Sequence, residues 1–350
     1  MAKEKHIFII TDISYNPVKM FLDQMHKLSK GFMRLGHDAR IFSYRKALLH
    51  KNPLKSKTFS RYFFKSKTDQ LLVEQLKNYK PDIVYLTFAK LLDVNTIEKA
   101  RIAAPNAVFI GFDGDPWPKL KKNRIETAKK LDIITATNDG KFLQDYRDAG
   151  VPLCVFMPNM CDPDIDHRYD VGPEWKTDII WTGKARHHAD TSETFREKLV
   201  TKLAKRENCT LYGCFGRPQI GGQNYLYAIS GAKIGVNVNA YGPVKFCHSD
   251  RLTQYLACGT FVMAKRFDGC DLLYKDKFHL CYFDTKEEFF ELADYYLGHE
   301  QERKKIADAG MKRVHEEFNS TKIAGYIIEL IEKHRYSASW FEHLSTAKIG

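Results

Sequence analysis

The sequence of 350 residues predicts an α/β protein built from two doubly wound domains. Short apolar runs alternate with segments of helical periodicity, which is typical of parallel sheets covered by helices on both faces. The alternation stops in a stretch rich in Pro and Asp, 157–175, and then starts again. A chain of this length is also sufficient for two domains of ordinary size.

The first half of the sequence carries the strand and helix signals of one such domain. Its apolar runs predict strands over 6–11, 38–44, 83–88, 107–112 and 133–137. Apolar residues at helical spacing predict helices over 18–35, 71–79 and 94–103. Each predicted helix separates two predicted strands, as the crossovers of a parallel sheet require.

The second half repeats the pattern. Strands are predicted over 178–182, 210–212, 233–238 and 261–264. One helix is predicted to begin at Asp190, where Glu193 completes a capping box, and another begins at Ser249 and ends at Gly259. Three closing helices are predicted over 286–297, 301–318 and 321–334.

We therefore predict an N-terminal domain over 1–160, a linker over 161–175, a C-terminal domain over 176–334 and a tail over 335–350. The linker is assigned because it is rich in Pro and Asp and lacks periodicity. Packing of the tail against the N-terminal domain is one arrangement that this division allows. Ligands of such sheets bind beyond the carboxyl ends of the strands, so the loops there are where functional residues are expected.

The composition favours a cytoplasmic protein that binds anions. The formal net charge of +12 suits nucleotide phosphates, nucleic acid or an acidic membrane surface, although many basic proteins bind none of these. The eight cysteines form no C-x-x-C pair, so we expect reduced thiols and neither a zinc site nor a redox motif. No apolar stretch reaches the roughly 18 residues of a membrane span. Any membrane contact is then expected to be peripheral, at the inner face.

Five segments of the second half carry a resemblance to one enzyme family. Residues 249–264 read SDRLTQYLACGTFVMA and resemble the R-x-x-E-x-x-A-x-G signature of GT-B glycosyltransferases, particularly the family 1-like group that includes spore-maturation-type proteins. The other similar segments are IIWTGK (179–184), LYGCFG (211–216), ISGAKIGVNVN (229–239) and the closing helices at 295–318. The resemblance implies two Rossmann-like domains facing each other across a cleft. It implies a UDP- or GDP-linked sugar as donor in the C-terminal half, and neither a cofactor nor a metal ion.

Basic residues near two turns are the candidate ligands of the donor diphosphate. A helix beginning near Ser249 offers free N–H groups to phosphate, and Arg251 in its first turn can form paired hydrogen bonds with a diphosphate. In the resembling family, basic residues at the turn after the first strand of the donor domain bind this group. The resemblance therefore implies the same role for the residues in and after the turn, Gly183, Lys184, Arg186 and Arg196. A solvated helix face is the alternative for Arg196.

The loop and helix over 241–258 depart from the family pattern. The family usually places Glu, which binds the ribose hydroxyls, where this sequence has Gln254. Gln254 is still a candidate donor ligand, because its uncharged amide can accept the proton of one ribose hydroxyl. Retaining members commonly have another Glu where this sequence has Phe246, so the sequence favours an inverting reaction. Lys245 is a candidate phosphate ligand and His248 a candidate sugar ligand, and either could be a plain surface residue.

The candidate catalytic base is an aspartate of the N-terminal half. An inverting transfer needs a group that takes the proton of the acceptor hydroxyl. A predicted strand delivers Asp113 and Asp115 to its carboxyl end, and this segment resembles the strand and catalytic Asp of phage DNA β-glucosyltransferases. The alternative is a structural turn stabilised by the aspartate side chains. Asp12, which follows the first strand, is a weaker candidate for the base.

A basic segment over 45–67 is the candidate acceptor surface. It contains no acidic residue and interleaves aromatic residues with cations, including Lys55, Lys57, Arg61, Lys65 and Lys67. This pattern suits a lipid–phosphate surface or a nucleic-acid backbone, while a solvated basic loop is the plain alternative. The acceptor is then a surface glycan or lipid-linked saccharide, or a hydroxymethylated base in phage-type DNA. A GT-B nucleotide-sugar epimerase and a sugar-nucleotide-binding protein without catalysis are the other functions that the sequence leaves open.

Overall fold

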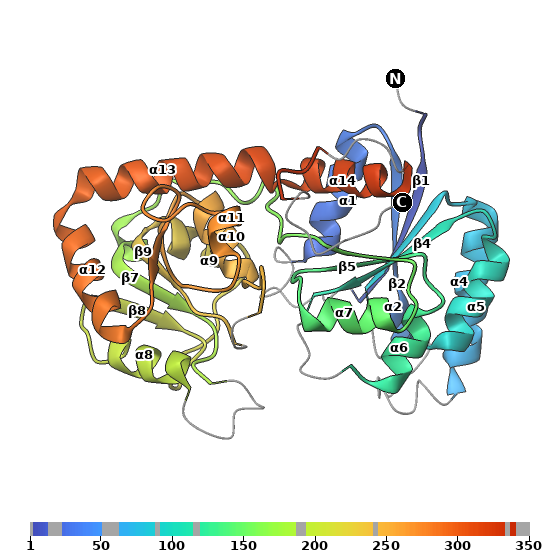
Figure 1. Cartoon of the computed structure of the whole chain (residues 1–350), viewed down its shortest axis with the longest axis horizontal. Helices are drawn as coiled ribbons and strands as arrows, with labels where there is room; N and C mark the ends of the chain where they lie inside the picture. The colour runs from blue at the N-terminus through green and yellow to red at the C-terminus, as the bar shows by residue number, and fades with distance from the viewer. Residues whose placement is uncertain are drawn as a thin grey trace. The chain divides into compact units, whose positions relative to one another are not determined.

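The computed structural model describes residues 3–12, 23–50, 63–87, 92–114, 120–186, 194–240, 244–332 and 337–340. The chain divides into two compact units (Figure 1). The described residues up to Pro158 and those from Ile323 onward form the first unit, and residues 159–322 form the second. Each unit is built around its own parallel sheet.

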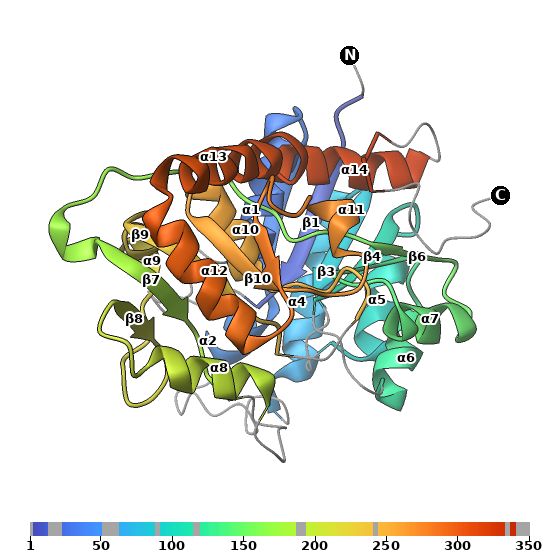
Figure 2. The ribbon, with the colours of Figure 1, turned by 60° about the vertical axis from the view of Figure 1, so that its left-hand side comes forward.

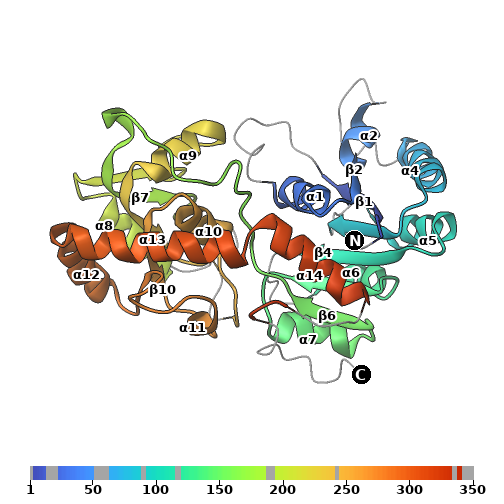
Figure 3. The ribbon, with the colours of Figure 1, turned by 90° about the horizontal axis from the view of Figure 1, so that it is seen from above.

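The sheet of the first unit has six parallel strands in the order β2-β1-β3-β4-β5-β6. The strands are β1 His6–Thr11, β2 Asp38–Ser43, β3 Ile83–Thr87, β4 Val108–Asp113, β5 Ile133–Ala136 and β6 Leu153–Phe156. The helices are α1 Gln24–Arg34, α2 Tyr44–His50, α4 Lys65–Tyr79, α5 Val94–Ala103, α6 Lys122–Ala128, α7 Lys141–Asp148 and α14 Ser320–Glu332. Figure 3 shows α4 and α5 side by side on one face of this sheet and α1 with α14 on the other.

Two helices of the first unit begin at residues other than those predicted from the sequence. The described part of α1 begins at Gln24 rather than at 18, because the side chain of Asp23 accepts a hydrogen bond from the Met25 N–H and caps the helix. Helix α4 begins at Lys65, well before the predicted start at 71. The prediction missed these residues because the first turns of the helix are polar and its apolar stripe begins only at Leu72. Lys65 and Lys67 are therefore helical residues and not part of a loop.

The sheet of the second unit has five parallel strands in the order β11-β10-β9-β7-β8. The strands are β7 Thr177–Thr182, β8 Cys209–Tyr212, β9 Ala232–Asn237, β10 Phe261–Lys265 and β11 Cys281–Phe283. The helices are α8 Phe195–Leu203, α9 Gly222–Ser230, α10 Asp250–Ala257, α11 Cys270–Leu273, α12 Lys286–Gly298 and α13 Glu300–Glu317, with a short 3-10 helix at Pro173–Trp175. Figure 2 shows α12 and α13 over β10, where their apolar residues join the core of this unit.

The cap of α8 differs from the prediction, and α12 has a capping box that was not predicted. Helix α8 begins at Phe195, and its cap is Thr194, whose side chain accepts the N–H of Glu197 at 3.2 Å. The capping box predicted at Asp190 and Glu193 is therefore wrong as the start of this helix, and both residues lie outside the described part of the chain. A capping box is present instead at α12, between Thr285 and Glu288.

The division into units corrects the predicted domain boundaries. The predicted linker is a packed part of the second unit, since Cys161, Asp162 and Asp166 are fully buried there. The chain returns to the first unit at Ile323, so most of α14 belongs to that unit. This helix was predicted to lie in the C-terminal domain. The described tail residues also belong to the first unit, where Trp340 packs against a tyrosine of α14.

The buried side chains of both units are mostly apolar, and the thiols are among them. All eight cysteines are free, and seven of them are buried, where they act as small apolar side chains. Burial raises the pKa of the Cys154 and Cys281 thiols to about 12. Among the described helices, none is both long enough and apolar enough to span a bilayer.

Candidate functional site

Two glycine turns lie side by side at the carboxyl edge of the second sheet. Gly183 directly follows strand β7, and its φ of +114° is a conformation that other residues rarely adopt. Gly213 directly follows the neighbouring strand β8 and has φ +80°. The Gly183 N–H donates to the Tyr212 carbonyl at 2.8 Å, and a Cβ atom added to Gly213 would lie 3.4 Å from the Gly183 Cα. The two turns therefore approach each other through backbone alone.

Two arginines converge on the Gly183 turn. The guanidinium carbons of Arg251 and Arg196 lie 4.6 Å and 5.0 Å from the ring centroid of Trp181. A Cβ atom at Gly183 would lie 3.3 Å from Nη1 of Arg251 and 3.8 Å from Nη2 of Arg196. A side chain at this position would therefore crowd both guanidinium groups. We call these four residues, Trp181, Gly183, Arg196 and Arg251, the arginine cluster.

Arg251 is anchored by backbone carbonyls of two strand ends. Its Nη1 donates to the carbonyl of Thr182, and its Nη2 donates to the carbonyl of Val238 at 3.4 Å. Within the described part of the chain, no carboxylate lies at ion-pair distance from it. Its charge is therefore not neutralised by an ion pair, but two of its donors already hold the ends of β7 and β9 together.

The other predicted basic residues of this turn have different surroundings. Arg196 donates to the Lys184 carbonyl at 2.6 Å, so it lies over the turn and not on a solvated helix face. Arg186 is half-exposed, and its Nε lies 3.7 Å from a carboxylate oxygen of Glu197. The structure thus brings Arg196 and Arg251 together at Gly183, while Arg186 is partly neutralised by an acidic residue of α8.

Helix α10 begins beside the arginine cluster. Its N-cap, Ser249, makes no side-chain bond to the helix backbone, because its Oγ instead accepts a hydrogen bond from Nδ2 of Asn237 at 2.7 Å. The first N–H groups of α10 are therefore not capped by this serine. Asp250 is also in the first turn, where its negative charge opposes the attraction of an anion.

Gln254 is buried, and its amide is oriented by a tyrosine. Its side chain is 2% exposed, and its Oε1 accepts a hydrogen bond from the hydroxyl of Tyr225 at 2.9 Å. The Nε2 atom is buried and has no partner among the described residues. The sequence suggested that Gln254 accepts a proton from a ribose hydroxyl, but this oxygen is already in use. The group left to a ligand is the N–H donor.

The loop before α10 buries the histidine and a phenylalanine. His248 is 3% exposed, so it is not a plain surface residue. Its Nδ1 lies 2.9 Å from the Phe246 carbonyl, which assigns the proton of the neutral ring to Nδ1 and leaves Nε2 as an acceptor without a partner in the described chain. Burial lowers the pKa of His248 to about 4, so the ring is neutral at pH 7. Phe246 has a φ of +61° and is fully buried, and the Nζ of Lys245 lies 5.0 Å from its ring centroid.

In the first unit, the buried Asp113 is held by an ion pair with Arg124. It ends β4, is 3% exposed, and receives Nη1 of Arg124 at 2.6 Å from each of its oxygens. The Tyr146 hydroxyl donates to the same carboxylate at 2.7 Å, and burial together with Asp113 raises the pKa of Tyr146. These contacts occupy most of the sites through which a carboxylate could accept a proton.

The other aspartates predicted as bases differ in accessibility. Asp12 follows β1, and its side chain is 24% exposed. It accepts the N–H of Arg45 at 3.2 Å and lies 3.6 Å from the Nε of the same arginine. Asp115 lies outside the described residues. Of the two described candidates, Asp12 is the more accessible.

The predicted acceptor surface is described only in part. Lys55, Lys57 and Arg61 lie outside the described residues. The Nζ of Lys65 lies 2.6 Å from Oγ1 of Thr96 and 3.0 Å from Oδ2 of the buried Asp69, so this lysine joins an internal network. Lys67 is exposed on α4 and is thus the described lysine that is available to a partner.

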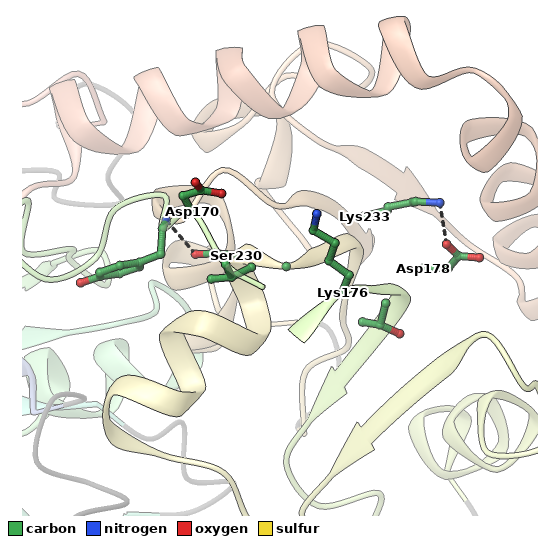
Figure 4. Close-up of a pocket in the computed structure, with 9 residues that line it drawn as sticks. Asp170, Lys176, Asp178, Ser230 and Lys233 are labelled. Atoms are coloured by element: carbon green, nitrogen blue, oxygen red, sulfur yellow. Dashed lines mark hydrogen bonds and ion pairs between the residues drawn. The ribbon is translucent and has the colours of Figure 1, made fainter. Parts of the chain in front are cut away.

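A cavity of about 460 Å³ in the second unit lies away from the arginine cluster. It is lined by residues before β7, at the amino ends of β7 and β9, and at the end of α9, and Figure 4 shows the ion pair of Lys233 with Asp178 at its rim. In a parallel sheet these strand ends are opposite to the Gly183 turn. The cavity therefore does not belong to the predicted donor site.

Residues 172–329 match the family model of glycosyl transferase-like proteins. This range contains the Gly183 turn, the arginine cluster and helix α10. A search of curated protein sequences finds no match. The matched family agrees with the resemblance carried by the second half of the sequence.

Solved structures with the same fold cover almost the whole chain. A glycosyltransferase from Rickettsia africae is 12% identical, covers 94% of this chain and 98% of its own, and has a TM-score of 0.60. HepE from Anabaena in complex with UDP and glucose is 12% identical, covers 95% and 100%, and has a TM-score of 0.62. Sucrose-phosphate synthase from Thermosynechococcus elongatus is 13% identical, covers 94% and 99%, and has a TM-score of 0.58. The chain thus has the two-domain GT-B fold of these solved structures, and its residues 172–329 match the glycosyl transferase-like family.

Proposed function

We propose that this chain is a glycosyltransferase that moves a sugar from a nucleoside diphosphate, bound at the arginine cluster, to a hydroxyl of a surface glycan or lipid-linked saccharide. The observation that carries the proposal is the convergence of Arg251 and Arg196 on the Gly183 turn. Two cations over a backbone turn without a Cβ atom suit the charge and the size of a diphosphate. HepE, which shares the fold, binds UDP and UDP-glucose, and this supports a UDP-linked donor.

The transfer proceeds with inversion in this proposal. The acceptor oxygen attacks the anomeric carbon, the bond from that carbon to the diphosphate oxygen breaks, and the leaving diphosphate takes the bonding electron pair. The arginine cluster stabilises the charge that develops on this diphosphate. The absence of a carboxylate at Phe246 and Gln254 supports inversion, because neither can act as a nucleophile toward the sugar.

Asp12 is the base that we propose for the acceptor proton. Of the described candidates it is the one with an accessible carboxylate, at 24% exposure against 3% for Asp113. Asp113 then has a structural role, as the anion that holds Arg124 and Tyr146. The proton of the acceptor hydroxyl passes to Asp12 as the new glycosidic bond forms.

A lipid-linked acceptor is supported by one exposed region of the first unit. Phe63 is 63% exposed immediately before α4, and Lys67 is exposed in the first turns of that helix. An exposed aromatic ring beside a cation suits the boundary of an anionic membrane. In this proposal the enzyme works at the inner face of the membrane as a peripheral protein.

The proposal is tested by donor binding and by product analysis. Calorimetric titration with UDP, GDP and their glucose conjugates is expected to give micromolar binding for one nucleotide class. Incubation of that donor with saccharide acceptors is expected to yield a product of inverted anomeric configuration by NMR. An epimerised donor, transfer to hydroxymethylated DNA alone, or binding without turnover would each overturn the proposed reaction.

A further inference from the structure

Two phenylalanines adopt left-handed backbone conformations in the second unit. Among the described residues other than glycine, positive φ values occur at Lys80, Phe215, Phe246 and Lys277. A bulky side chain in this conformation is an outlier, and such residues concentrate where a ligand is held. Phe246 is fully buried, but Phe215, with φ +49°, is 50% exposed. The fold thus exposes the ring of Phe215 to solvent although its left-handed backbone conformation costs free energy.

The loop that carries Phe215 is held by its own backbone. It follows β8, and the N–H of Gly213 donates to the Pro218 carbonyl at 2.9 Å. The N–H of Arg217 donates to the Cys214 carbonyl, also at 2.9 Å. Cys214 is buried beneath the loop, while the residues from Phe215 to Gln219 are exposed. Phe215 therefore stands on a defined turn and not on an irregular segment.

This loop adjoins the arginine cluster. Gly213 begins the loop and lies against the Gly183 backbone. Burial raises the pKa of the Cys214 thiol, and the positive charges of Arg217 and Arg196 oppose this rise. Within the described chain Arg217 has no carboxylate partner. The loop with Phe215 and Arg217 and the arginine cluster are thus neighbours at the carboxyl ends of the strands.

We propose that Phe215 stacks on the base of the donor nucleotide, beside β8, while the diphosphate lies at the arginine cluster. This inference rests on the proposed function, because it needs the donor diphosphate at Gly183. A flat heterocycle gains affinity by stacking on an aromatic ring, whatever the pattern of its hydrogen-bond groups. Placing the base at Phe215 directs the sugar the other way, toward β9 and the loop before α10.

The test separates the base from the diphosphate. Binding of UDP and of inorganic diphosphate is measured by calorimetry for the wild type and for Phe215→Ala. Stacking of one base contributes about 1–3 kcal/mol, so the substitution is expected to weaken UDP binding about 5- to 150-fold. Diphosphate, which has no base, is expected to bind the variant as it binds the wild type.

Phe278 provides the matched control. It is 54% exposed in the same unit, but it precedes β11. It therefore lies at the amino ends of the parallel strands, while Gly183 lies at their carboxyl ends. Phe278→Ala is expected to leave the affinities for UDP and diphosphate unchanged. A loss of UDP affinity in both variants would mean that general unfolding, and not stacking, explains the effect.

A glycine at position 215 distinguishes a ligand contact from a structural role. Phe215→Gly removes the ring and also removes the cost of the left-handed conformation, so its melting temperature is expected to equal or exceed that of the wild type. Its UDP affinity is nevertheless expected to fall as in Phe215→Ala. A Phe215→Tyr variant keeps the ring and is expected to retain the affinity.

The outcomes separate this inference from the proposed function. If Phe215→Ala binds UDP as tightly as the wild type, and diphosphate also binds, the base lies elsewhere and the inference is wrong. If the wild type binds neither UDP, GDP nor diphosphate, the donor site itself is wrong. An equal loss for UDP and diphosphate would place Phe215 at the phosphates and would also overturn the stacking role.

Discussion

Arg251 lies over the indole ring of Trp181, with its guanidinium carbon 4.6 Å from the ring centroid. Arg196 lies 5.0 Å from the same centroid. The ring is 1% exposed, and its N–H donates to the Gly183 carbonyl at 2.9 Å, so it cannot turn away. Arg196 and Arg251 both carry a positive charge beside the same indole ring, so they repel each other. A bound anion that contacts both would relieve this repulsion, so the proposed binding of a diphosphate would stabilise the cluster.

Replacing Arg251 should therefore affect both the fold and the ligand. In Arg251→Ala, the carbonyls of Thr182 and Val238 lose their donors, and a loss of about 1–3 kcal/mol in the free energy of unfolding is expected. UDP affinity is expected to fall at least about tenfold, since a charged hydrogen bond contributes more than about 1.4 kcal/mol. Urea unfolding and calorimetry check the two effects.

Arg206 is the matched control for this substitution. Its guanidinium carbon lies 5.4 Å from the Phe290 ring centroid, so it makes the same kind of contact on another part of the second unit. Arg206→Ala is expected to leave UDP affinity unchanged. A normal UDP affinity in Arg251→Ala would show that the diphosphate does not bind at this cluster.

Gly183→Ala should disturb the cluster without removing a charge. The φ of +114° makes any side chain unfavourable there, and the new Cβ atom would lie 3.3 Å from Nη1 of Arg251. Gly36→Ala serves as the control, because Gly36 has φ +83° but a Cβ atom added there would meet no other atom within 4 Å. Both variants are expected to lose roughly 1–2 kcal/mol of stability from the backbone. Only Gly183→Ala should also lose UDP affinity, and equal affinities in the two variants would contradict this role.

The alternation of apolar runs and helical segments predicted most of the fold because buried parallel strands are apolar throughout. Segment 94–103 was predicted from its helical spacing with the bounds of α5, and the structure adds a cap at Asp93, whose side chain accepts the N–H of Thr96. The first turn of α4 was missed because Lys65 is polar, and only the folded chain brings Asp69, Asp93 and Thr96 around it. Such partners are distant in sequence or depend on helix geometry, so periodicity does not reveal them.

The candidate site was predictable to a different extent in each unit. The turn at Gly183 was found through the resemblance of 179–184 to a segment of the family, and the helix after Ser249 through the family signature and its Gly259 stop. The partners of Asp113 could not be found, since Arg124 and Tyr146 reach it from two later helices. The role proposed for Phe215 was also hidden, because an exposed aromatic residue in a left-handed conformation has no signature in the sequence.

The two described aspartates of the first unit should respond differently to amide substitution. Asp113→Asn removes the negative charge that binds Arg124, whose side chain is 20% exposed, and a loss of about 1.5–3 kcal/mol in the free energy of unfolding is expected. Asp12→Asn should keep the fold and the affinity for UDP, but should lower kcat about 100-fold or more, because the base is lost. Thermal melts and transfer rates check both. Full transfer activity in Asp12→Asn would exclude Asp12 as the base and leave Asp113 and Asp115 as the candidates.

The buried histidine of the second unit should make stability depend on pH. Burial lowers the pKa of His248 from 6.5 to about 4, so the unfolded chain binds its proton at a higher pH than the folded chain does. Stability from this group is complete above about pH 6.5 and is lost as the pH falls toward 4. Between pH 7 and pH 5 the loss is about 2 kcal/mol. His279, whose pKa is also lowered to about 4 by burial, adds to the total. Urea unfolding of the wild type and of His248→Gln at both pH values isolates the share of His248, because the variant keeps His279. An equal pH dependence in the two proteins would mean that His248 is not buried as a neutral ring.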